Sequence, residues 1–324
     1  MSNVQNGKAF EYAIAIEYLS FVRNLGLNAV LANNAPTNTA RTYFETSPIE
    51  ERTKYLLASR SSIATMMKLE TGFVSPKNER DVLQIRIASD SEGEYGDVRD
   101  VIFARPVSRW ELGFSAKNNN DAVKHSRLSP TIDFGESWLG HPVSQSYWED
   151  VLPIFRYLQQ LKDAGTEWNE IEDIKPTRVY IPVLDAFKAE ILRLCAEYPD
   201  VPQRLVMYLL GGKPFYKVIK DDNANMVIIK AFNIRGELNQ VVNGNKPAYK
   251  TKEVYLPTRI VELDYKIKND GTRSQNTLNM ILDYGWEISF RLHSAATKVE
   301  PSLKFDVQML GNPPVLFTQY IFQE

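Results

Sequence analysis

Two carboxylates and a lysine on neighbouring strand-like runs are the side chains of this sequence best suited to chemistry on a phosphate. Asp100 directly precedes the apolar run 101–104, and Glu111 and Lys117 lie in a second strand-like run, 110–117. Because alternate side chains of a strand share a face, Glu111 and Lys117 are expected on one side. Carboxylates on adjacent strands can hold Mg²⁺, and a lysine can orient water or stabilise developing charge. The pattern is compatible with phosphodiester hydrolysis, in which Asp100 and Glu111 would be metal ligands and Lys117 a catalytic residue.

Other interpretations of these residues stay open. A loose Asp–Glu–Lys spacing is common by chance, and Glu111 and Lys117 also fit solvated positions on an edge strand. Asp97, in the preceding turn, is the alternative to Asp100, which is favoured because it adjoins the apolar strand. Glu11 shares a helical face with apolar residues, so it is expected to turn inward and to need a partner. It either forms a salt bridge at the core edge or is a further catalytic acid near the metal.

Length and composition exclude several classes of protein. The 324 residues suffice for one large domain or two closely joined ones. A formal net charge of −2 does not indicate a nucleic-acid partner, which would need a local basic surface. One cysteine, Cys195, excludes an intrachain disulfide and fits a reducing, cytoplasmic setting. No signal peptide and no apolar run of ~18 residues is present, so no membrane partner is expected. Neither a Gly-rich phosphate loop nor a G-x-S-x-G elbow occurs.

The periodicity predicts an α/β (α+β) chain with a mixed sheet flanked by helices. Helices are expected at 8–24, 48–70, 121–128, 147–161, 183–198 and 202–210. Strands at 81–88, 101–104 and 110–117 are expected to form a meander.

After residue 212 strand patterns dominate, at 216–220, 226–232, 254–256, 258–265, 278–284, 286–292 and 303–310, with turns at 243–244 and 269–271. Residues 213–273 hold twelve Lys or Arg against seven Asp or Glu. We therefore expect a first region at 1–211, which contains the candidate metal site, and a distinct β-rich, basic region at 212–324.

Six blocks of the chain together resemble type II restriction endonucleases of the HaeIII family. They are GKAFEYA at 7–13, GDVRDV at 96–101, WELGFSAKNNNDAVKHSRLS at 110–129, IDFG at 132–135, SYWEDVLPIF at 146–155 and SFRLHSAATKVEPSLKFDVQMLG at 289–311. The resemblance implies a PD-(D/E)XK nuclease fold, Mg²⁺ as cofactor and double-stranded DNA cut within the palindrome GGCC. It also implies a cognate cytosine DNA methyltransferase. A palindromic target suggests a homodimer on DNA, although a monomer that nicks each strand in turn is the alternative.

The resemblance carries over to particular residues. Asp100 matches the first metal-binding acid of the family, and Lys117 matches the motif lysine. Ser115 stands where the motif normally has an acid, two residues before the lysine. Either Glu111 reaches the metal from a displaced position, or Glu11 from the first helix fills the gap.

Two groups of polar residues are expected to contact DNA. Residues that contact base edges in the major groove are expected within the block 289–311. The candidates are Arg291, His293, Ser294, Lys298 and Lys304. Phosphate contacts, which position DNA without reading its sequence, are expected from the segment after the motif lysine, at Asn118, Asn119, Lys124, His125 and Arg127. The alternatives are a solvated helix face for Lys124, His125 and Arg127, and an ordinary sheet-surface position for Arg291.

Two rival functions fit the same sequence. One is a non-catalytic, sequence-specific DNA-binding protein on a degenerate nuclease scaffold, which the serine at 115 favours. The other is a repair or phage nuclease that prefers a DNA structure over a sequence. Cleavage assays on plasmid, nicked, branched and mismatched DNA separate the three.

Overall fold

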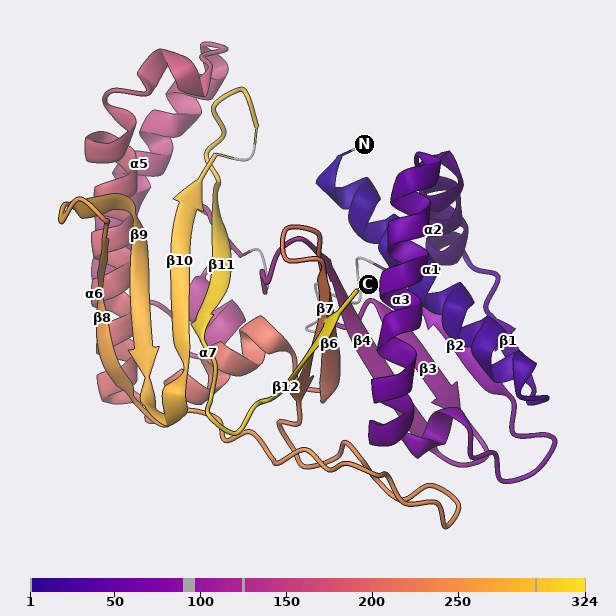
Figure 1. Cartoon of the computed structure of the whole chain (residues 1–324). Coiled ribbons are helices and arrows are strands. Elements are labelled where there is room, and N and C mark those ends of the chain that lie inside the picture. The colour runs from indigo at the N-terminus through magenta and orange to yellow at the C-terminus, as the bar shows by residue number, and fades with distance from the viewer. Residues whose placement is uncertain (1, 90–96, 124–125, 295, 324) are drawn as a thin grey trace. The chain divides into compact units, whose positions relative to one another are not determined.

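The computed structural model describes residues 2–89, 97–123, 126–294 and 296–323. The chain forms two compact units that alternate along the sequence (Figure 1). Unit 1 comprises residues 1–121, 211–254 and 315–324, and unit 2 comprises residues 122–210 and 255–314. The expected division at 211/212 coincides with one of these boundaries, but each side of it contributes to both units.

Unit 1 is built on a mixed seven-stranded sheet, so the predicted fold class is confirmed. In spatial order its strands are β1 (Ala29–Leu31), β2 (Leu83–Ile87), β3 (Val101–Arg105), β4 (Trp110–Asn118), β6 (Phe215–Asp221), β7 (Met226–Phe232) and β12 (Phe317–Phe322). The pairs β1–β2 and β4–β6 are parallel and the others are antiparallel. The expected β2–β3–β4 meander is present.

Three helices of unit 1 cover one face of this sheet (Figure 1). They are α1 (Asn3–Asn24), α2 (Ala35–Thr46) and α3 (Ile49–Leu69), and the 3₁₀ turn η1 (Thr71–Phe73) follows α3. A capping box between Ser2 and Gln5 starts α1. The helices predicted at 8–24 and 48–70 are confirmed, whereas α2 was not predicted.

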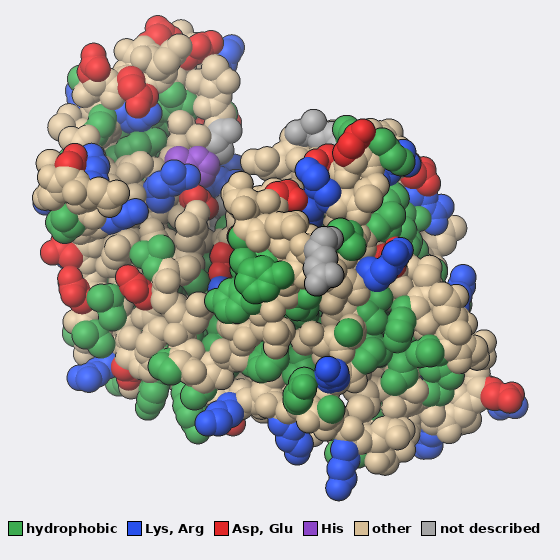
Figure 2. Space-filling model, viewed as in Figure 1, with side chains coloured by type: hydrophobic (Ala, Val, Ile, Leu, Met, Phe, Trp, Pro, Cys, Tyr) green, Lys and Arg blue, Asp and Glu red, His purple; other side chains and the backbone are tan. Residues whose placement is uncertain are grey.

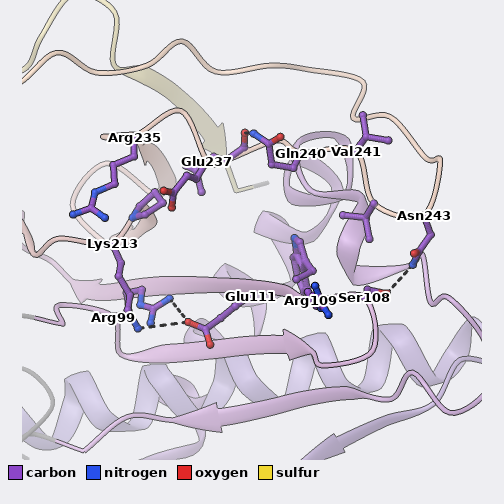
Figure 3. A pocket seen from close by; sticks show the side chains of 14 residues that line it. Arg99, Ser108, Arg109, Glu111, Lys213, Arg235, Glu237, Gln240, Val241 and Asn243 are labelled. Atoms are coloured by element: carbon purple, nitrogen blue, oxygen red, sulfur yellow. Dashed lines mark hydrogen bonds and ion pairs between the residues drawn. The ribbon is translucent and has the colours of Figure 1, made fainter.

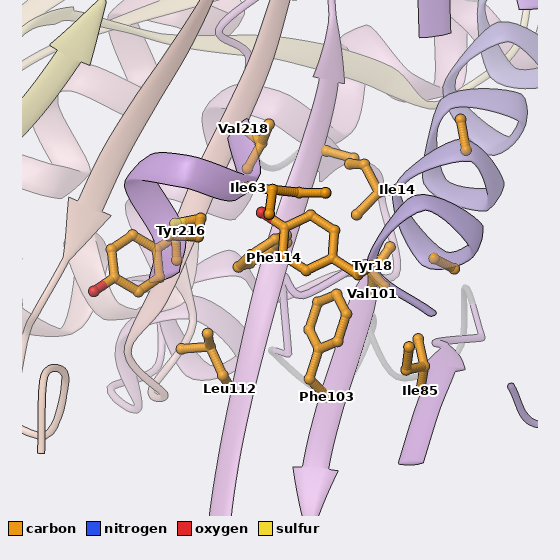
Figure 4. Close-up of a cluster of buried hydrophobic side chains, with 14 of the residues drawn as sticks. Ile14, Tyr18, Ile63, Ile85, Val101, Phe103, Leu112, Phe114, Tyr216 and Val218 are labelled. Carbon is orange, nitrogen blue, oxygen red and sulfur yellow. The ribbon is translucent and has the colours of Figure 1, made fainter. Parts of the chain in front are cut away.

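The helices meet the sheet in an aromatic core (Figure 4). Tyr18 of α1 packs against Phe103 of β3 and Phe114 of β4, with ring centroids 5.2 and 5.4 Å apart. The Tyr18 hydroxyl lies 2.8 Å from the Ser62 hydroxyl of α3, so its polar end is satisfied. Phe114 occupies the face of β4 that the alternation assigned to apolar contacts. This packing sets the position of α1 over β3 and β4.

A buried arginine ties the end of β3 to η1. The Arg105 guanidinium is inaccessible to solvent and donates to the carbonyl oxygens of Gly72, Phe73 and Asp81. Burial lowers the pKa of Arg105 from its ordinary value. The side chain thus provides hydrogen-bond donors to three backbone carbonyls, two in η1 and one just before β2.

We expect Arg105→Met to lower the free energy of unfolding by about 3 kcal/mol, because three buried carbonyls lose their donor. Urea unfolding followed by circular dichroism measures the change. Arg80→Met, which alters an exposed arginine of the same unit, is the matched control. Equal midpoints for the two variants would show that the Arg105 hydrogen bonds add nothing to stability.

The long connection after β7 is held by a buried carboxylate. Glu70, at the end of α3, accepts hydrogen bonds from the Tyr216 hydroxyl and the Asn239 amide, each at 2.9 Å. Residues 242–245 form the tight turn that the Asn-Gly pair predicted, with Asn243 and Gly244 at positive φ. Val242 and Asn245 exchange two backbone hydrogen bonds across this turn. The connection is therefore ordered although it contains no strand.

Burial raises the pKa of Glu70 to about 7, with its hydrogen bonds opposing the shift. The folded protein keeps this proton at pH values where the unfolded chain releases it, so the stabilisation is complete below pH 4.5 and is lost as the pH rises through about 7. The shift corresponds to roughly 3 kcal/mol. The free energy of unfolding, measured with urea, should therefore fall between pH 5 and pH 8. We expect Glu70→Gln to remove this decrease. Glu79→Gln, at an exposed site, should keep the wild-type dependence.

Unit 2 contains an antiparallel five-stranded sheet with helices on one face (Figure 1). Its strands, in order, are β5 (Arg127–Leu128), β11 (Leu303–Gly311), β10 (Glu287–His293), β9 (Arg273–Leu282) and β8 (Ile260–Ile267). The helices are α5 (Gln145–Asp163), α6 (Ile181–Glu197) and α7 (Val201–Leu210), with short turns η2 (Gly135–Leu139), η3 (Trp168–Ile171), η4 (Pro176–Tyr180) and η5 (Asp283–Gly285). Phe187 of α6 packs on Phe290 and Phe305, which defines the apolar face of the sheet.

Two local predictions are wrong. The described residues of the predicted helix 121–128, which are 121–123 and 126–128, are not helical, because Ala122 bridges Gln308 and β5 pairs with β11. Their backbone hydrogen bonds therefore go to a distant strand. Residues 254–256 form no strand, since Val254 donates a single bond to Asn233 and Pro257 soon follows. Strands β1 and β12, at the edges of the seven-stranded sheet, were not predicted.

Candidate active site

Asp100 and Lys117 come together where β3 begins and β4 ends. The Lys117 Nζ lies 3.4 Å from the Asp100 Oδ2, which also accepts from the Ala116 amide at 2.8 Å. The Ser115 hydroxyl lies 3.3 Å from the same oxygen. Among the described residues no hydrogen bond goes to Oδ1. One oxygen of Asp100 is therefore held by β4, while the other is available to a ligand.

Glu11 brings a second carboxylate to this place from α1. Its side chain is buried, and its Oε2 accepts from the Lys8 Nζ at 3.2 Å. Burial raises the pKa of Glu11 to about 8, and the charge of Asp100 adds to the increase. Lys8 and Lys117 act in the opposite direction. The charges of Asp100, Lys8 and Lys117 thus all act on the buried Glu11 carboxyl group.

Glu111 lies at the other end of β4. It shares a strand face with Lys117, as the alternation predicted, but six positions separate them, or about 20 Å along a strand. The Glu111 Oε1 pairs with Arg99 at 2.9 Å and lies 3.7 Å from the Lys213 Nζ. Asp97 holds the same Arg99, at 2.8 Å. The structure therefore places Asp97 and Glu111 together around an arginine, away from Asp100.

This end of β4 opens into a polar pocket of about 540 Å³ (Figure 3). Arg99 and Glu111 line its floor, and residues 108–110, Lys213, Pro214 and the 235–243 connection line the rest. A Cβ at Gly113 would lie 2.1 Å from the Arg99 side chain, so the glycine leaves room for the arginine. The pocket belongs to a charged network separate from the Asp100 site.

Two buried lysines continue the sheet face beside Ser115. Ser115, Lys217 and Lys230 are register partners across β4, β6 and β7. Both lysines donate to the Asp121 carboxylate, Lys217 at 2.6 Å. Burial lowers the pKa of Lys217 to about 8, Asp121 opposes this, and Lys117 adds to it. The sequence indicates the face of each lysine by alternation, but not the parallel β4–β6 pairing that aligns them.

The asparagines after Lys117 are engaged within unit 1. Asn118 accepts from the Lys220 Nζ at 3.1 Å. Asn119, at positive φ, donates to the Asp222 carboxylate and accepts from the Asp222 amide, both at 2.7 Å. These bonds fix the end of β4 against β6. A role for either asparagine in DNA contact stays a prediction.

The remaining predicted DNA-binding residues lie in unit 2. Arg291 pairs with Asp306 at 2.9 Å, and the His293 Nδ1 lies 3.2 Å from the Ser294 carbonyl oxygen. Lys298 is exposed and bridges Glu167 through its backbone. Arg127 lies 3.3 Å from the Ser302 hydroxyl, and Lys304 is its register partner. Two further predicted residues, Lys124 and His125, lie outside the described residues.

The site combines the carboxyl groups of Glu11 and Asp100 with the ammonium group of Lys117. Within the described ranges there is no cluster of three or more Asp, Glu, His or Cys side chains suited to a metal. The pair formed by Glu11 and Asp100 offers carboxylate oxygens, which hard divalent cations prefer. Lys117 beside them can stabilise negative charge on a phosphate.

Comparison with known proteins assigns the class. The profile described as HaeIII restriction endonuclease matches residues 7–313. The type II restriction enzyme HaeIII of Haemophilus aegyptius is 39% identical over 319 residues, which cover 98% of this chain and 97% of that enzyme. The chain is thus a restriction endonuclease, an enzyme class that acts on double-stranded DNA. It belongs to the HaeIII restriction endonuclease family, as the six sequence blocks indicated.

Two comparisons gave negative results. No solved structure matches the chain significantly. In the part of the chain that the structure describes, no helix is long and apolar enough to cross a bilayer.

Proposed function

We propose that this protein is a Mg²⁺-dependent type II restriction endonuclease of the PD-(D/E)XK kind that hydrolyses duplex DNA at the palindrome GGCC. The observation that carries the proposal is the convergence of Glu11, Asp100 and Lys117 at the end of β4, in a chain of the HaeIII family. The target follows from the family resemblance and from the similarity to HaeIII itself.

The carboxylate pair fits a divalent cation. Glu11 is buried, and burial together with repulsion from the charge of Asp100 raises its pKa. A cation would relieve this repulsion and let both groups ionise. Glu11 and Asp100 would hold Mg²⁺, which when bound neutralises charge on the scissile phosphate. Glu11 then fills the place that Ser115 leaves without an acid.

The other residues of the site have distinct roles in the proposal. Lys117 orients the attacking water or donates to a phosphate oxygen, where it stabilises the developing negative charge. Water forms a bond to phosphorus as the bond to one sugar oxygen breaks, and the attacking water gives up a proton to solvent while the leaving sugar oxygen takes one up from solvent. Ser115 and the Ala116 amide hold Asp100 Oδ2 and fix the carboxylate plane. Glu111 has no catalytic role in this assignment, because it pairs with Arg99.

Digestion of a sequenced plasmid tests the proposal. With Mg²⁺ we expect discrete fragments whose ends map within GGCC, and with a chelator no cutting. Premethylation of the plasmid by a GGCC-specific cytosine methyltransferase should protect it. Tight binding to one sequence without cleavage under Mg²⁺ or Mn²⁺ would instead favour the non-catalytic DNA-binding protein. Cutting confined to branched or mismatched DNA would favour a repair nuclease.

The proposed partners follow from the target. A palindrome is best read by two copies related by a two-fold axis, so we propose a homodimer on DNA. Sedimentation of the protein with a GGCC duplex, in chelator, measures the stoichiometry. One chain per duplex would support a monomer that nicks each strand in turn. We expect the gene for the proposed cognate cytosine methyltransferase to lie next to the gene for this protein, which the genome sequence checks.

A further inference from the structure

Three basic side chains from three strands lie in one line across the sheet of unit 2. Arg127 of β5 is the register partner of Lys304 of β11, which is also the register partner of His293 of β10. Residues directly opposite on antiparallel strands share a face, with Cβ atoms about 5 Å apart. The three side chains therefore project together from one edge of the sheet.

This row lies on the face of the sheet that turns away from the helices. Its sequence neighbours Leu128, Leu292 and Leu303 are fully buried, as expected for the opposite, apolar face. Figure 2 shows Lys or Arg side chains beside a histidine near the end of β10. Arg127 is exposed and Lys304 and His293 are half-buried, so each of the three residues keeps some contact with solvent.

Like charges placed directly opposite each other destabilise a sheet. Arg127 and Lys304 are such a pair. Burial lowers the pKa of Lys304, and Arg127 lowers it further. The nearest carboxylate, Asp306, is already paired with Arg291. Among the described residues Lys304 forms no ion pair, so the row keeps a surplus of positive charge that folding alone does not explain.

We propose that the row Arg127–Lys304–His293 binds a backbone phosphate of the duplex and holds the DNA on unit 2 without reading its sequence. The inference rests on the proposed function, because it takes duplex DNA as the substrate. Donors from Arg127 and Lys304, which lie opposite each other on neighbouring strands, suit the oxygens of a single phosphate, and His293 lies beside Lys304 on the next strand. It also changes the expectation for His293 and Lys304 from base reading to backbone contact.

The test is the salt dependence of DNA binding by the full chain, measured by fluorescence anisotropy in chelator so that no DNA is cut. Loss of one phosphate contact lowers the slope of log K against log salt by about 0.9, which is about eightfold in affinity at 0.1 M salt. We expect this change in Lys304→Gln, equally for a GGCC duplex and an unrelated duplex. Lys162→Gln, which removes an exposed charge on α5, should behave as wild type.

Two further measurements separate charge from structure. Lys304→Gln should melt at the wild-type temperature or above it, because it removes like-charge repulsion. Lys304→Arg should keep the wild-type affinity and slope. Loss of affinity in Lys304→Arg as well, or a lowered melting temperature in Lys304→Gln, would overturn the inference.

The outcomes also distinguish this inference from the proposed function. If the wild-type protein binds and cuts GGCC DNA but Lys304→Gln matches Lys162→Gln in slope and affinity, only the phosphate site is overturned. If the wild-type protein neither binds nor cuts duplex DNA, the proposed function fails and the inference fails with it.

Discussion

Glu11→Gln is expected to lower the DNA cleavage rate by about a thousandfold, whereas Glu111→Gln should stay within about threefold of wild type. Both changes remove one carboxylate from unit 1 and keep its shape. Only Glu11 lies beside Asp100. Glu111 pairs with Arg99, which Asp97 continues to hold after the substitution. A difference in cleavage rate between the two variants therefore shows that the position of the lost carboxylate matters, because each variant loses one carboxylate.

Glu11→Gln is unlike most buried substitutions in its effect on folding. The pKa of Glu11 is about 8, so the metal-free protein at pH 7 holds mainly the neutral acid, which an amide imitates. The melting temperature at pH 7 without metal should therefore change little. Calorimetric titration with Mn²⁺ in the absence of DNA should show weaker binding for Glu11→Gln than for Glu111→Gln. The reverse order in cleavage and Mn²⁺ binding would assign the metal to Glu111.

Strand alternation predicted this site well where the interactions are local. It placed Phe114 toward the core and Lys117 on the opposite face, and both positions are confirmed. The helical period predicted that Glu11 turns inward, and the side chain is buried. These results follow from patterns of two and 3.6 residues, which each segment carries by itself.

The alternation of side chains along a strand did not predict which side chains lie close together in space. Glu111 and Lys117 share a face of β4, but they lie near its opposite ends. Glu111 forms an ion pair with Arg99 instead. The partner of Asp100 comes from α1, some ninety positions earlier, and packing of Tyr18 on Phe103 and Phe114 sets that placement. Such contacts depend on tertiary packing, which no local period encodes.

The same limit explains the errors in unit 2. Residues 121–128 have the polar composition of a capped helix, but β11 offers a strand partner about 180 positions away. The row formed by Arg127, His293 and Lys304 likewise joins two sequence blocks that only the β5–β11–β10 pairing brings together. The sequence indicated that these residues are basic, but not that they are adjacent.

Lys117→Met is expected to lower cleavage by about 10²- to 10³-fold while binding of the GGCC duplex in chelator stays within about threefold. Lys213→Met is the matched control. Both lysines pair with an aspartate at 3.4 Å, Lys117 with Asp100 and Lys213 with Asp97. Only the first pair lies at the proposed metal site. Single-turnover cleavage and fluorescence anisotropy measure the two quantities.

The dependence on Mg²⁺ separates a catalytic lysine from one that only orders the site. Lys117 is the ion-pair partner of Asp100, so its removal leaves more negative charge at the carboxylate pair. Half-maximal cleavage by Lys117→Met should therefore occur at the same or a lower Mg²⁺ concentration, with the maximal rate still reduced. A maximal rate restored by excess Mg²⁺ would mean that Lys117 serves only to position Asp100. Full activity at ordinary Mg²⁺ would remove Lys117 from the active site and leave Glu11 and Asp100 as its only assigned members.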